Sequence, residues 1–188
     1  MWKGAQDFTR VKEGMGKHTD WTVLTLTFDP KGWRTPWSMW RGGLHLWDRL
    51  RKRFTREWGK CRYVQTWESH RSGKPHVNIA ISNENFYTAC VMDWRLVRRQ
   101  WVKPHATASG FGRIAHVTTA YDRDGLAGYF VKLARELTGT AHKDQIPYAA
   151  PPHFRRLRAS QGLLPPRYKN DDISGRLHFY PAEIADLI

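Results

Sequence analysis

The chain has 188 residues, of which 40% are hydrophobic and 13% aromatic, enough for one folded domain with a sizeable core. Lys and Arg outnumber Asp and Glu by 31 to 17, and the net charge of +14 favours a polyanionic partner. No apolar run approaches the roughly 20 residues of a membrane span, and the N-terminal segment lacks the apolar core of a signal peptide. We therefore expect a cytoplasmic protein with no membrane partner.

The first predicted elements are a strand and a long helix. The segment WTVLTLTFDP (21–30) is β-branched and alternating, and its Asp-Pro ends the strand. Thr25 and Thr27 are interpreted as ordinary strand residues, with support of ligands on a neighbouring strand as the alternative. Apolar residues then recur at helical spacing, which predicts a helix from about 36 to 58 that stops at Gly59.

A hairpin and a further helix–strand–helix unit follow. The predicted elements are strands at 61–69 and 76–82, a glycine loop and then a strand within 109–120, and helices at 83–103 and 122–140. This order predicts an α+β fold, an antiparallel sheet of about four to five strands with flanking helices. After residue 140 the chain is rich in proline and has little periodicity. We predict a core domain at 1–140 and a basic, proline-containing extension at 141–188 packed on the same domain.

The two cysteines point to neither a disulfide scaffold nor a zinc site. Cys61 and Cys90 are too few for the first and too isolated for the second. We interpret both as buried thiols in a reducing compartment.

Polar residues on the predicted hairpin are suited to binding a cation. Side chains alternate along SGKPHVNIAIS (72–82), so His76 and Asn78 share one strand face, roughly 6–7 Å apart. Glu68, near the end of the preceding strand, becomes their cross-strand neighbour when the hairpin closes. A carboxylate, an imidazole and an amide oxygen together suit Mg²⁺ or Mn²⁺. The alternative is a strand histidine with a structural role.

The last predicted helix carries a candidate nucleophile. Tyr129 and Lys132 are three residues apart in GYFVKLARE (128–136), so they share one helix face. A phenol beside an ammonium group has an electrostatically favoured anion. The alternative is a tyrosine at the core margin beside a surface lysine. Tyr121 is a weaker candidate because no lysine follows it three residues later.

Three basic clusters are spread along the chain, at 49–56, 95–103 and 153–160. Together they favour nucleic-acid binding, whereas each alone is also typical of a solvated helix face. The arginines predicted to contact DNA are Arg51, Arg53, Arg98, Arg99, Arg155, Arg156 and Arg158. The ten tryptophans offer stacking platforms for unpaired bases, although we expect most of them in the core.

Three of these segments, in this order, resemble the motifs of the HUH endonucleases. VLTLTFDP (23–30) is similar to the first motif, WESHRSGKPHVNIAI (67–81) to the second and YFVK (129–132) to the third. The stretches at 110–132 and 155–167 also resemble the rolling-circle replication initiator (Rep) proteins of plasmids, phages and small single-stranded DNA viruses. The resemblance covers about residues 21–167.

At two positions the chain can be compared with variants within that family. Asn78 stands where the family has a second histidine, and similar viral proteins carry glutamine there, so an amide has precedent. Leu133 stands one turn after Tyr129, which by the family's logic marks a single-tyrosine enzyme.

The resemblance implies an RRM/ferredoxin-like HUH fold and a metal-dependent DNA endonuclease and strand transferase. Mg²⁺ or Mn²⁺ would be held by Glu68, His76 and Asn78. Tyr129 would attack the scissile phosphate, with Lys132 favouring its phenolate, to give a 5′-phosphotyrosine and a free 3′-OH. Nicking and joining of single-stranded DNA would then initiate rolling-circle replication at a single-stranded or hairpin DNA origin.

The sequence also bears on partners and alternatives. It lacks a Gly-x-x-x-x-Gly-Lys-Ser/Thr nucleotide-binding loop, so a host helicase would unwind the DNA. The resemblance places the protein in a bacterial cytoplasm, or in the nucleus if its source is a eukaryotic virus. Two alternatives stay open: a transposase or mobilisation relaxase of the same superfamily, and a non-catalytic single-stranded nucleic-acid-binding module.

Overall fold

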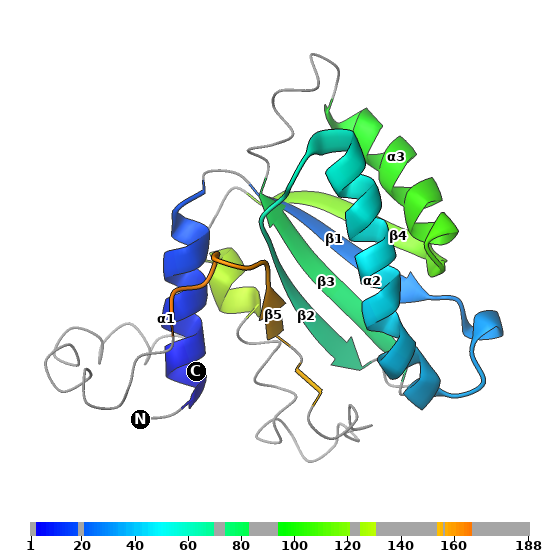
Figure 1. The fold of residues 1–188 in the computed structure, drawn as a ribbon, viewed down its shortest axis with the longest axis horizontal. Coiled ribbons are helices and arrows are strands. Elements are labelled where there is room, and N and C mark those ends of the chain that lie inside the picture. Colours follow the sequence, from blue (N-terminus) through cyan, green and yellow to red (C-terminus); the bar gives the residue numbers. More distant parts are fainter. Residues whose placement is uncertain are drawn as a thin grey trace, which may run out of the picture.

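A computed structural model confirms the predicted α+β fold. It describes residues 3–18, 21–69, 74–82, 94–120, 125–130, 154–155 and 157–166. The described part forms a five-stranded antiparallel sheet of order β4-β1-β3-β2-β5 (Figure 1). The strands are β1 (Trp21–Phe28), β2 (Tyr63–Ser69), β3 (Pro75–Ser82), β4 (Phe111–Ala120) and β5 (Leu157–Ala159). The helical elements are α1 (Lys3–Gly16), η1 (Pro30–Gly32), α2 (Pro36–Trp58) and α3 (Trp94–Ala108), and residues 125–130 are also helical.

The central four strands have ferredoxin-like connections. The chain runs β1-α2-β2-β3-α3-β4, and the spatial order of these strands is β4-β1-β3-β2. β2 and β3 form the predicted hairpin, and α2 has the predicted bounds. This topology places β1 beside β3, although the whole of α2 and β2 separates them in sequence.

Two features differ from the sequence-based expectation. Helix α1 was not predicted, and it is held to the domain by Val11 and Met15, which are one turn apart and fully buried. Strand β5 lies within the predicted extension 141–188 and pairs with β2, so this part of the extension belongs to the sheet. The predicted helix 83–103 is described from Trp94 onward and continues to Ala108.

Local sequence fixes both ends of α2. The Thr35 hydroxyl accepts a hydrogen bond from the Ser38 N–H at 3.2 Å, and the Ser38 hydroxyl accepts one from the Thr35 N–H at 3.2 Å. This capping box satisfies two donors at the start of the helix, and Pro36 follows at the first turn. Gly59 ends the helix with φ 82°, and its N–H donates to the Thr55 carbonyl.

Side-chain alternation gives the sheet two buried faces. Helices α2 and α3 cover one, which we call the α2/α3 face, and its core includes Leu24, Trp67 and Ile79 (Figure 1). Helix α1, residues 125–130 and the segment after β5 pack on the other, which we call the α1 face. The core of the α1 face comprises Val11, Met15, Trp21, Val64, Ala80, Leu126, Ala127, Phe130 and Leu163.

Close approach of α2 to the sheet depends on a glycine. A Cβ on Gly43 would lie 2.6 Å from ring atoms of Trp67 and 2.7 Å from the ring of Phe28. Both aromatic side chains are buried, and their rings lie 5.9 Å apart between centroids. The rings therefore fill the space that a side chain at this position would need.

We predict that Gly43→Ala destabilises the fold although alanine favours helix. Overpacking against Trp67 and Phe28 should cost about 1–3 kcal/mol, more than the gain of about 1 kcal/mol in helix propensity. Urea unfolding would measure the difference. Gly16→Ala is the matched control, because a Cβ there meets no atom within 4 Å and should leave stability unchanged or slightly raised. Equal stability of the two variants would contradict the packing argument.

Cys61, just before β2, is a partly buried thiol that packs against the core of the α2/α3 face. Burial raises its pKa to about 11, partly opposed by a backbone hydrogen bond and by Arg51. Cys90 lies outside the described residues.

We predict that in a Cys90→Ser background Cys61 reacts with a thiol reagent at pH 8 roughly two orders of magnitude more slowly than free cysteine. A rate equal to that of free cysteine would show an unshifted thiol.

Candidate functional site

On the α1 face, three neighbouring strands change from apolar to polar along their length. The register aligns Val23, Ala80 and Val64 in one row across β1, β3 and β2. Two residues further along each strand, the next row is Thr25, Asn78 and Thr66. Successive rows on one face are roughly 6–7 Å apart. The apolar row lies under the core of the α1 face, and the polar rows lie at its border.

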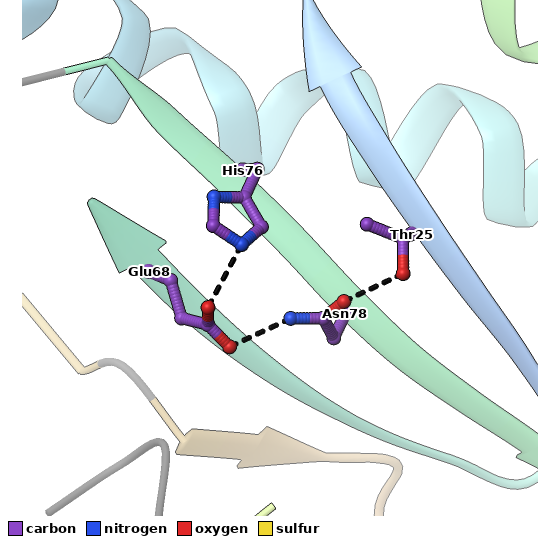
Figure 2. Close-up of polar contacts among 4 residues, drawn as sticks. All are labelled: Thr25, Glu68, His76 and Asn78. Carbon is purple, nitrogen blue, oxygen red and sulfur yellow. Dashed lines mark hydrogen bonds and ion pairs between the residues drawn. The ribbon is translucent and has the colours of Figure 1, made fainter. Parts of the chain in front are cut away.

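The hairpin register confirms the predicted juxtaposition of Glu68 with the β3 residues. Glu68 pairs directly with His76 in the row beyond Asn78. Figure 2 shows Glu68 on β2, His76 and Asn78 on β3, and Thr25 on β1, turned toward one another. Residues from three strands therefore converge on one patch of the α1 face.

Four side chains form a continuous chain of polar contacts in this patch. The His76 Nε2 lies 2.8 Å from the Glu68 Oε2, and the Asn78 Nδ2 donates to the Glu68 Oε1 at 2.7 Å. The Thr25 hydroxyl donates to the Asn78 Oδ1 at 2.7 Å (Figure 2). Thr25 therefore contacts a polar residue of the neighbouring strand through its hydroxyl.

The donor set fits a divalent cation at Glu68 and His76. The Glu68 Oε2 and the His76 Nε2 are 2.8 Å apart, the distance of a direct hydrogen bond or ion pair. A divalent cation bound between the two atoms would replace that contact. A carboxylate oxygen and an imidazole nitrogen both serve such ions. Side chains of Glu68 and His76 are 14% and 23% exposed, so solvent reaches both. The described residues contain no group of three or more His, Cys, Asp or Glu side chains that could hold a metal ion.

Asn78 differs from these two in burial and in contacts. It is 2% exposed, and its amide oxygen accepts the hydrogen bond from Thr25. Its amide nitrogen faces Glu68. Its predicted role as a third ligand through oxygen would require that oxygen to leave Thr25.

The helical residues 125–130 place the candidate nucleophile on the same face as this patch. Leu126, Ala127 and Phe130 are buried in the core of the α1 face, together with Ala80 of β3. Tyr129 is 44% exposed, and its ring contacts that of Phe130 edge-on. Lys132 and Tyr121 lie outside the described residues.

One further histidine borders the patch. His116 of β4 pairs in register with Thr25, so it extends the row of Thr25 and Asn78 toward the sheet edge, and it is exposed. Sequence spacing did not single it out, because only the pairing of β4 with β1 brings it there. The alternation of β4 would have identified it once that pairing was known.

The described side chains among the arginines predicted to contact DNA lie away from this patch. Arg51 on α2 lies 3.5 Å from Asp48, which also interacts electrostatically with Arg158 on β5. Arg158 has a lowered pKa because of burial and of the positive charge of Arg155, and its guanidinium lies 5.7 Å from the ring of Phe154. Two of the predicted basic clusters thus meet beside α2.

Of the other arginines predicted to contact DNA, only Arg53 has a described side chain. The Arg53 Nη1 lies 3.5 Å from the His105 Nδ1, and burial, together with Arg53, lowers the pKa of that histidine. Arg98 and Arg99 fall within α3, but their side chains lie outside the described part, as does Arg156. The basic side chains beside α2 and the Glu68 patch therefore occupy opposite faces of the sheet.

No protein-family model, curated protein or solved structure matches the chain. Within the described residues, no helix is long and apolar enough to cross a membrane.

Proposed function

We propose that the chain is a metal-dependent, single-tyrosine DNA endonuclease and strand transferase of the HUH type. In this proposal it nicks and rejoins single-stranded DNA at a replication origin and so initiates rolling-circle replication. The observation that carries the proposal is the shared face of the sheet. The Glu68–His76–Asn78 patch and the helical residues that carry Tyr129 lie on the same side.

Glu68 and His76 would hold Mg²⁺ or Mn²⁺ at the exposed edge of the patch. When bound there, the ion would neutralise negative charge on the scissile phosphate. The two side chains approach from paired positions on adjacent strands, so the sheet fixes their separation. The polar row next to them, from Thr25 to Thr66, holds no charged side chain that would repel a phosphate.

Tyr129 would supply the nucleophile. Its hydroxyl oxygen forms a bond to phosphorus, the bond from phosphorus to the 3′-oxygen breaks, and that oxygen takes a proton to become a free 3′-OH. The phenolic proton passes to solvent, and Lys132 is predicted to favour the phenolate. Because the phosphotyrosine retains a phosphodiester bond, attack by a 3′-OH reverses the step and joins the strand.

The charge distribution supports DNA as the substrate. A net charge of +14 attracts phosphates over the whole molecule, and the arginines beside α2 offer contacts away from the patch. We propose that they bind DNA flanking the cleaved segment, with His116 beside the patch. A host helicase would supply the unwinding.

The alternatives predict different experimental results. A transposase or relaxase would share the first chemical step and differ in the DNA it accepts. A non-catalytic binding module explains the charge but gives no reason for the Glu68–His76–Asn78 chain beside the Tyr129 helix.

We predict that Tyr129→Phe abolishes covalent attachment to DNA. The full chain would be mixed with Mn²⁺ and a pool of 3′-labelled single-stranded oligonucleotides, since the adduct keeps the 3′ fragment, and resolved on a denaturing gel. An SDS-resistant labelled band is expected from the wild type and not from Tyr129→Phe or with EDTA. Tyr129 is 44% exposed, so the loss of its hydroxyl should change stability by no more than about 0.5 kcal/mol.

The matched control for that experiment is Tyr121→Phe, which should keep the adduct. Mapping the DNA-linked peptide identifies the attacking residue directly. An adduct that survives in Tyr129→Phe would refute the assignment, and salt-sensitive binding without any adduct would favour the non-catalytic module.

We predict that Glu68→Gln separates DNA binding from cleavage. Loss of the carboxylate should weaken Mn²⁺ binding by at least about tenfold and remove the adduct, while salt-dependent DNA binding persists. Glu57→Gln makes the same change of charge at an exposed position on α2 and should alter neither property. Normal cleavage by Glu68→Gln would exclude Glu68 from the site.

A further inference from the structure

We propose that Thr25 is a positioning residue that orients the amide of Asn78 and, through it, the carboxylate of Glu68. This inference rests on the cation site of the proposed function and assigns a specific role to a β1 residue outside the ligand set. It also assigns Asn78 to positioning rather than to metal ligation. The interaction that carries it is the hydrogen-bond chain from Thr25 through Asn78 to Glu68 (Figure 2).

Burial leaves the Asn78 amide dependent on protein partners. The residue is 2% exposed and lies in the middle of a three-strand row, with Thr25 on one side and Thr66 on the other. A buried polar group that loses its hydrogen bond has no water to replace it. The two bonds of 2.7 Å therefore fix how the amide lies.

The chemistry of Glu68 determines which end of the amide faces it. An ionised carboxylate only accepts hydrogen bonds, so the amide must present its nitrogen to Glu68 and its oxygen to Thr25. A hydroxyl can donate, and Thr25 does so here. Reversing the amide would set the Asn78 oxygen against the Glu68 carboxylate, and repulsion between the two oxygens would disfavour that state.

This arrangement fixes the Glu68 carboxylate from both sides. Its Oε1 receives the amide N–H of Asn78, while its Oε2 lies against His76. The carboxylate is thus oriented before a cation binds. The amide oxygen of Asn78 accepts the hydrogen bond of Thr25 and does not contact the ion. Hydrogen bonds of this kind hold metal ligands in place, and their loss typically lowers metal affinity by about 10–100-fold.

The chain offers a matched control for Thr25. Thr66 flanks Asn78 on the opposite strand, is fully buried, and its hydroxyl has no hydrogen-bond partner among the described residues. Thr25→Val and Thr66→Val both exchange a hydroxyl for a methyl group in the same row. Only the first of them removes a hydrogen bond to Asn78.

Mn²⁺ binding to the full chain, followed by the electron paramagnetic resonance signal of free Mn²⁺, tests the proposal without DNA. Thr25→Val should raise the Kd for Mn²⁺ about tenfold, and Thr25→Ser, which keeps a hydroxyl, should restore it to within about twofold. Thr66→Val should stay within about twofold of the wild type. Equal losses in Thr25→Val and Thr66→Val would overturn the proposal, as would failure of the wild type to bind Mn²⁺.

A double-mutant cycle tests whether Thr25 acts through Asn78. If it does, Thr25→Val combined with Asn78→Ala should bind Mn²⁺ no more weakly than Asn78→Ala alone. Additive losses would show that the two residues act independently and would overturn the proposal. The thermal transition of each variant shows whether the fold is intact, and Thr25→Ala, which also removes the hydroxyl, replaces Thr25→Val if the latter does not fold.

These experiments distinguish failure of the positioning role of Thr25 from failure of the nuclease proposal. Glu57→Gln should bind Mn²⁺ as the wild type does, because that residue is exposed on α2, away from the hydrogen-bond chain. If Mn²⁺ binding depends on Thr25 but no covalent adduct forms with any oligonucleotide, the positioning role stands and the nuclease proposal fails. If an adduct forms and Thr25→Val binds Mn²⁺ normally, the nuclease proposal stands and the positioning role fails.

Discussion

The candidate site depends on the antiparallel register of β1, β3 and β2. Pairing Glu68 with His76 and Thr25 with Asn78 brings three strands' polar groups to one patch. Side chains alternate along a strand, so a shift of one residue in β3 would turn His76 and Asn78 to the opposite face. The same shift would expose Val77 and Ile79, which are fully buried in the core of the α2/α3 face. The apolar core therefore secures the register on which the polar patch depends.

The two faces of the sheet are stabilised by different contacts, and this difference suits the site proposed on the α1 face. Large aromatic side chains and the close contact of α2 at Gly43 fill the α2/α3 face. In the described part of the chain, the cover of the α1 face consists of α1, residues 125–130 and the segment after β5. At the border of that cover, Glu68 and His76 combine a rigid strand backbone with access to solvent. A site for a charged substrate needs both properties.

The proposed chemistry requires the tyrosine to approach a phosphate held near Glu68 and His76. Phe130 and Ala127 anchor the helical residues 125–130 in the core beside Ala80, two residues along β3 from Asn78. Tyr129 remains exposed next to this anchor. The basic side chains beside α2 lie on the opposite face, so DNA that reached both regions would pass around the sheet edge. In the proposed function, these side chains would attract and position the DNA rather than contact the reacting phosphate.

The sequence by itself determined the types of β1, α2, α3 and β4, the bounds of α2, the β2–β3 hairpin and the pairing of Glu68 with His76, because these follow from periodicity, the Gly59 stop and a short turn. It also placed Tyr129 on a helix, and residues 125–130 are helical. The tertiary structure alone decided that β1 lies beside β3, and with it the contact of Thr25 with Asn78, the place of His116, and the pairing of β5 with β2. Helix α1 was missed because its apolar residues gain stability only against Trp21, Val64 and Ala80. Contacts between segments distant in the chain leave no local pattern, since they depend on which surfaces the assembled core brings together.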